Sequence, residues 1–281
     1  MDVGILGPAT VTWQLHADPA MWVAGIASLH LQSLHPGAVA GVVQNSDFRR
    51  DPLGRLRRTA SFVGTVSYGP TARVHEAAAR VRGLHRTLRA TDASGRTFRV
   101  DDPELLLWVH CAEVHSFVEV VRRAGYRLTD AQVDRYYDEQ RRTAALVGLH
   151  EDEVPGSARA VADYFAGVLP ELRRTADSEL VRRFLLRPPL TGPPRLALGA
   201  YEPLLGRLAY SLLPPWATAL HGHRPYPEPV ATALLRATRA AALAVPGPIR
   251  WSVPEGHVNE AVRRLGRLGR HAAPRRALLP S

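Results

Sequence analysis

Apolar residues recur at three- and four-residue steps through most of this chain, the spacing that places side chains on one face of an α-helix. No region shows the short alternating strands of a sandwich or barrel. Short Pro- and Gly-containing breaks separate the helical segments, and no linker-like stretch divides the chain. The pattern therefore predicts an all-α fold with one large helical domain over residues 1–281, with one small hairpin near residues 91–101.

Several helix starts are marked by local sequence signals. An Asp-Pro pair supplies a capping side chain followed by proline at the first helical position. Such pairs predict helices opening at Asp18-Pro19 (to about Leu34), Asp51-Pro52 and Asp102-Pro103. A short apolar helix is expected from Gly37 to Asn45, and a capping box at residues 129–132 predicts a helix to Leu146.

The segment from Thr71 to about Arg89 has an apolar stripe that contains a histidine. The stripe consists of Val74, Ala78, Val81, Leu84, His85 and Leu88. A core histidine can be a structural, hydrogen-bonded residue. An imidazole on an apolar helix also meets the requirement for proximal haem ligation, because one nitrogen can bind iron while the pocket excludes water.

The helix that opens at Asp102-Pro103 is the most hydrophobic of the chain and is expected to be central and buried. Within it, Glu113 is expected to have a basic or hydrogen-bonding neighbour, because a buried carboxyl is costly without one. His110, Glu113 and His115 do not match a di-iron site, which needs Glu-x-x-His on two helices. Cys111, the single cysteine, is expected to be a buried thiol.

Arg55, Arg58 and Thr59 share one face of the helix that opens at Asp51-Pro52. Two arginines beside a hydroxyl can bind anionic groups such as propionates, since the guanidinium keeps its charge and offers a planar fork. A solvated basic helix face is the alternative interpretation.

The charge balance is strongly basic, with 36 basic and 26 acidic residues, and every basic residue is arginine. Because the arginines are scattered and no recognition motif is present, nucleic-acid binding is not expected. The Arg-containing end, residues 263–281, is expected to be a solvated tail. No signal peptide and no run long enough for a membrane span is present, which favours a cytoplasmic protein.

Several motifs in order resemble the MpaB/rubber-oxygenase (latex-clearing-protein-like) family of haem b proteins. They are SLHPGAVAGVVQNSDFRRDPLGRLRRT, VSYG, RVRGLH and DDPELLLWVH, with a looser match through YYDEQRRTAALVGL. The best match covers roughly residues 30 to 150. The resemblance implies a globin-like helical core, over about residues 19–250, that holds one b-type haem.

The resemblance also implies roles for individual residues. The family's proximal histidine falls on His85, which would be the iron ligand. Arg55, Arg58 and Thr59 would line the distal pocket or bind the haem edge, and His110 would have a supporting role near the haem. Arg58 stands where rubber-cleaving members have lysine, and Val39 stands about where their acidic base is expected, so polyisoprene cleavage is not predicted.

These implications together predict a haem b-dependent oxygenase or related oxidative enzyme. Its partners would be O2 and a small, largely apolar organic substrate, with Arg58 and Thr59 as the catalytic candidates beside the iron. A second hypothesis is a haem protein that stores or senses a ligand without turnover. A third and weaker one is an Arg-rich nucleic-acid binder, whose affinity would fall steeply with salt.

Overall fold

A computed structural model of the chain describes residues 2–46, 50–189, 196 and 198–266. The described part is predominantly helical, and its only strands form a two-stranded antiparallel hairpin, so the predicted all-α class is confirmed. The solvated tail expected from residue 263 does not begin there, because residues 263–265 end a helix and Leu265 is fully buried; the positions beyond 266 lie outside the described residues. Among the described helices, none combines the length and the apolar composition needed to cross a bilayer.

The elements of the N-terminal half are, in order, α1 (Val11–Leu15), α2 (Met21–Gln32), α3 (Pro36–Asn45), α4 (Pro52–Tyr68), α5 (Thr71–Thr87), β1 (Arg89–Thr91), β2 (Thr97–Arg99), α6 (Pro103–Arg123) and α7 (Asp130–Val147). The elements that follow are η1 (Glu151–Glu153), α8 (Ala158–Val168), η2 (Leu169–Glu171), α9 (Ala176–Leu186), α10 (Leu198–Tyr201), η4 (Glu202–Gly206), α11 (Arg207–Tyr210), α12 (Pro215–His221), α13 (Glu228–Ala244), α14 (Gly247–Arg250) and α15 (His257–Leu265).

With one exception, the predicted helix starts agree with the observed caps. The exception is Asp18-Pro19, because α2 begins at Met21 and its N-cap, Ala20, has no capping side chain. The side chains of Asp51 and Asp102 accept backbone N–H groups at the first turns of α4 and α6, and Thr129 forms a complete capping box on α7. The predicted hairpin is present as β1 and β2, and Ala90 pairs with Phe98. Two other features differ from the sequence prediction. Helix α1 was not predicted. Leu84, which was expected on the buried stripe of α5, is 57% exposed.

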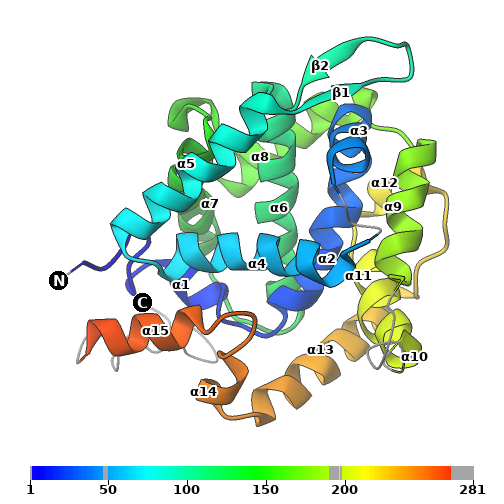
Figure 1. Cartoon of the computed structure of the whole chain (residues 1–281). Helices are drawn as coiled ribbons and strands as arrows, with labels where there is room; N and C mark the ends of the chain where they lie inside the picture. Colours follow the sequence, from blue (N-terminus) through cyan, green and yellow to red (C-terminus); the bar gives the residue numbers. More distant parts are fainter. Residues whose placement is uncertain (1, 47–49, 190–195, 197, 267–281) are drawn as a thin grey trace.

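The centre of the fold is the packing of α2 against α6, the most extensive contact between two helices in the described part. Figure 1 shows α6 running through the middle of the molecule with α2 beside it, and α4 crossing in front of both. Trp108 of α6 is fully buried, and its indole N–H donates to the carbonyl oxygen of Gln32 at the end of α2 over 3.0 Å. This bond satisfies a buried donor and fixes the two helices lengthwise.

A buried carboxylate attaches the short helix α1 to α7. Glu139 accepts from the backbone N–H groups of Val11 and Thr12, at 3.0 and 2.9 Å, and from the hydroxyl of Thr12 at 2.9 Å. Arg135, one turn earlier on α7, donates to the same carboxylate at 3.1 Å. The negative charge thus lies at the N-terminal end of α1, where unpaired N–H groups attract an anion.

We predict that Glu139→Ala lowers the free energy of unfolding by about 3 kcal/mol, because it leaves buried donors without an acceptor. Chemical denaturation followed by circular dichroism measures this loss. Glu76→Ala is the matched control, since Glu76 is exposed and pairs only with Arg80 one turn away on α5. The control is expected to change stability by less than about 0.5 kcal/mol. Equal effects of the two substitutions would contradict the role given to Glu139.

Candidate functional site

A large cavity of about 930 Å³ lies beside the central helix pair. Its walls come from one face each of α2, α4 and α6, with Tyr201 and Leu205 from α10 and η4 and a C-terminal segment at residues 250–258. The walls are mostly apolar, with a small number of polar side chains among them. This size and composition are typical of a site for a small organic ligand or cofactor.

Helix α4 presents one continuous face to the large cavity. Arg55, Thr59, Val63 and Ser67 recur at every fourth position and all line it. Thr59 donates its hydroxyl proton to the carbonyl oxygen of Arg55 in the preceding turn, at 3.3 Å. The sequence prediction that Arg55 and Thr59 share a functional face is therefore consistent with their position.

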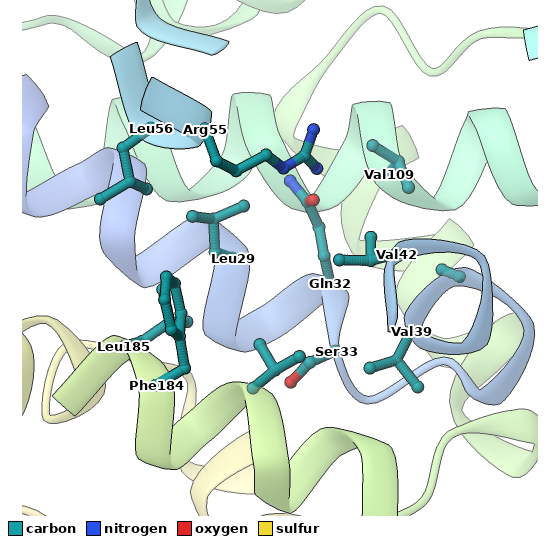
Figure 2. Close-up of a pocket in the computed structure, with 12 residues that line it drawn as sticks. Leu29, Gln32, Ser33, Val39, Val42, Arg55, Leu56, Val109, Phe184 and Leu185 are labelled. Carbon is teal, nitrogen blue, oxygen red and sulfur yellow. The ribbon is translucent and has the colours of Figure 1, made fainter. Parts of the chain in front are cut away.

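Arg55 is half-buried and forms no ion pair or hydrogen bond through its side chain within the described residues. Burial, and then the neighbouring charge of Arg58, lower the pKa of its guanidinium. Figure 2 shows Arg55 reaching from α4 toward the side-chain amide of Gln32 on α2, with Val109 of α6 nearby. These residues line a smaller cavity of about 50 Å³ that shares Arg55 with the large one. An unpaired interior cation of this kind is a ready binding point for an anion.

Arg58 lies apart from this face. Its guanidinium is exposed and pairs with the carboxylate of Asp51 at 2.9 Å, and it does not line the large cavity. Asp51 also accepts from the backbone N–H of Gly54, so the pair belongs to the N-terminal cap of α4. The structure does not bring Arg58 together with Arg55 and Thr59 at the cavity wall.

His85 lies near the C-terminal end of α5, on the helix that follows α4. Its ring forms no hydrogen bond within the described residues, and its Nδ1 atom is buried. Burial lowers the pKa of its imidazole, Asp101 raises it, and the positive charge of Arg55 lowers it further. His85 is not among the described residues that line the large cavity.

His110 lies in the middle of α6, one position from Val109 of the cavity wall. Burial lowers the pKa of its imidazole to about 4, so the ring is neutral at neutral pH. No described residue forms a hydrogen bond with it. His110 is thus a half-buried neutral imidazole near the site rather than a member of its polar lining.

Glu113 lines the large cavity one turn after Val109, and this position corrects the sequence prediction. A basic or hydrogen-bonding partner was expected, yet Glu113 forms neither an ion pair nor a hydrogen bond within the described residues. Burial alone raises the pKa of its carboxyl to about 7. The expectation was wrong because the carboxyl faces an open cavity instead of packed protein.

A chain of hydrogen-bonded polar groups, which no sequence motif indicated, also reaches this wall. His16, which follows α1, has its Nδ1 atom 2.8 Å from the hydroxyl of Ser67 and its Nε2 atom 3.2 Å from the hydroxyl of Tyr136. Burial lowers the pKa of His16 to about 3, so its ring is neutral. Its edge meets the ring of Phe117 on α6 at 5.4 Å between centroids.

The segment at residues 250–258 supplies the outer wall of the large cavity. Glu255 fastens it to α4: its carboxylate accepts from Arg57 at 3.1 Å and from the hydroxyl of Ser61 at 2.5 Å. His257 packs against Gly64, where a side chain would collide with its ring. Sequence reasoning missed this wall because its contacts join residues almost two hundred positions apart.

Three other histidines, His115, His221 and His223, do not converge on a metal site within the described residues. His115 contacts the hydroxyl of Tyr137 at 3.4 Å and faces a separate cavity, away from Glu113. His221 bonds the carbonyl oxygen of His30, and His223 bonds Glu179. No group of three or more potential metal ligands lies together in the part of the chain that the structure describes. Cys111 is buried as predicted, and burial raises the pKa of its thiol to about 12.

We predict a pH-dependent effect of Glu113→Gln on stability. A carboxyl whose pKa is about 7 when folded and near its ordinary 4.5 when unfolded destabilises the folded state increasingly as pH rises through this interval. The glutamine variant avoids this ionisation, so it should be more stable than the parent by about 3 kcal/mol at pH 8. The difference should nearly vanish at about pH 4.5.

Denaturation curves at several pH values measure this difference. Glu119→Gln, on the exposed side of the same helix, should change stability little at any of them. A Glu113→Gln effect of the same size at both ends of the pH range would show that the carboxyl does not titrate in this way.

Comparison with known proteins identifies a family for this chain. The family model described as the catalytic domain of the ER-bound oxygenase mpaB/B' and rubber oxygenase matches residues 13–245. The chain is 25% identical over 151 residues to the uncharacterized proteins Mb2261 of Mycobacterium bovis and Rv2237 of Mycobacterium tuberculosis. This alignment covers 52% of the chain and 59% of each relative. No solved structure matches.

The matched range includes α2 and α4 to α7, and so contains Arg55, Thr59, His85, His110 and Glu113. The outer wall at residues 250–258 lies just beyond it. The chain belongs to the mpaB/rubber-oxygenase catalytic-domain family.

Proposed function

We propose that this protein is a haem b-dependent oxygenase that uses O2 to oxidise a small, largely apolar organic molecule. The observation that carries the proposal is that two consecutive helices each present a polar side chain without a partner among the described residues. Within the described residues, neither ring nitrogen of His85 on α5 has a hydrogen bond, and the guanidinium of Arg55 on α4 has no ion pair.

The residues present fit a haem group. Because Nδ1 of His85 is buried, Nε2 is the nitrogen left for a metal ion. Arg55 supplies a fixed positive charge suited to a haem propionate, which would replace the missing partner of the guanidinium. His110 adds a second neutral imidazole near the wall of the large cavity, where it would help to form the environment of the haem.

The substrate would bind in the large cavity. Haem, when bound, supplies the activation of O2, and the protein orients and shields the reactants. The apolar side chains of α2, α4 and α6 hold a hydrophobic molecule and exclude water. Thr59 is one hydroxyl of α4 that lines this space, and it lies one turn from Arg55. Rotation away from its present acceptor would let it donate to a bound ligand.

Arg58 is not proposed as a ligand of the iron. The guanidinium remains protonated at working pH and here pairs with Asp51 on the surface. Its place in the cap of α4 supports the helix start three residues before Arg55.

We predict that His85→Ala abolishes stoichiometric haem binding, because it removes the imidazole proposed to hold the iron. The haem content per chain, measured as the pyridine haemochrome after purification with a haem supply, should fall by about tenfold or more. His75→Ala is the matched control, since His75 is exposed on the same helix. It should keep the haem content of the parent.

Circular dichroism shows whether both variants remain folded. A folded His85→Ala protein with the parent's haem content and absorption spectrum would overturn the assignment of the iron ligand.

A further inference from the structure

Glu113 is exceptional among the acidic residues that line the large cavity. Asp18 pairs with Arg239 at 2.7 Å, and Asp51 pairs with Arg58 at 2.9 Å. The chain has more basic than acidic residues, so arginines that could pair with a third carboxyl are plentiful. Glu113 nevertheless has none within the described residues.

The neighbouring groups that the structure describes do not pair with the carboxyl of Glu113. Val109 and Phe117, one turn to either side on α6, line the same cavity and are apolar. His16 is held by Ser67 and Tyr136 and stays neutral, so it does not serve as a counter-ion. The carboxyl is therefore held at the cavity wall in an apolar surrounding.

A carboxyl held in this way is costly unless a ligand satisfies it, since an interior polar group without a partner is penalised. When ionised, it can only accept hydrogen bonds. The complementary ligand is a molecule that fits apolar walls and carries a hydrogen-bond donor at one point. Sites of this design discriminate strongly against analogues that lack the donor.

We propose that Glu113 recognises the hydroxyl or amine group of an otherwise apolar ligand in the large cavity, and so determines which molecules the site accepts. This inference rests on the proposed function insofar as that ligand is the oxygenase's substrate. Glu113 positions the molecule by its polar group, and the remainder of the molecule lies against the apolar faces of α2 and α4.

Three probes of nearly equal size test the recognition: 1-octanol, its isomer heptyl methyl ether, which has no donor, and octylamine. Binding to the protein, purified with a haem supply, is measured by calorimetry at about pH 8, where the carboxyl is ionised. The parent protein should bind octanol or octylamine about tenfold more tightly than the ether. Glu113→Leu should remove this preference, and Glu119→Gln should keep it.

Glu113→Gln distinguishes the two donors. A preference for octylamine that disappears in this variant identifies an amine, because the neutral amide lacks the charge. A preference for octanol that the variant partly keeps identifies a hydroxyl, because the amide oxygen still accepts. Both outcomes support the proposal, and circular dichroism verifies that each variant is folded.

Equal binding of all three probes, no binding of any, or a donor preference that survives Glu113→Leu would overturn the proposal. The absorption spectrum of the same samples separates it from the haem assignment. Absent donor preference with a normal haem band contradicts the role of Glu113 alone. Donor preference in a protein that takes up no haem supports Glu113 and contradicts the oxygenase.

Discussion

The packing of α2 against α6 is the interaction on which the rest of this structure depends. Both helices bury large parts of their surface, and the hydrogen bond from Trp108 to Gln32 fixes them lengthwise. One side of this rigid pair is left open and forms the floor of the large cavity. Because the pair is well packed, the fold can carry a cavity of about 930 Å³ and unpaired polar groups at its wall.

Those unpaired groups give the site its chemical character. Arg55 on α4 and Glu113 on α6 are opposite charges that line one cavity without a partner among the described residues. Such groups lower the stability of the folded chain, and they are typical of sites whose ligands supply the missing interactions. The proposed haem would satisfy the cation, and the proposed substrate donor would satisfy the carboxyl.

Much of the fold could be predicted because its signals are local. Asp51, Asp102 and Thr129 cap helices within one turn of their own positions, and each helix begins where the sequence indicates. Helix α1 was missed because its stability comes from Glu139, more than a hundred residues away. Likewise, the periodicity of α5 could not show that the side chain of Leu84 remains largely exposed to solvent.

The same distinction holds for the candidate site. Spacing alone predicted that Arg55 and Thr59 share a helix face, but only the structure shows that this face lines a cavity. The contributions of His16 and of residues 250–258 depend on tertiary contacts, and Glu113 was expected to be paired because a sequence does not reveal cavities. The roles given to His85 and His110 came from family resemblance and stay predictions.

Titration of haemin into the haem-free protein, followed at the Soret band, tests the central claim most directly. The account predicts a sharpened band that saturates at one haem per chain and changes its position on reduction with dithionite. Haemin absorption that rises linearly with no end point, in a protein that circular dichroism shows to be folded and helical, would contradict it.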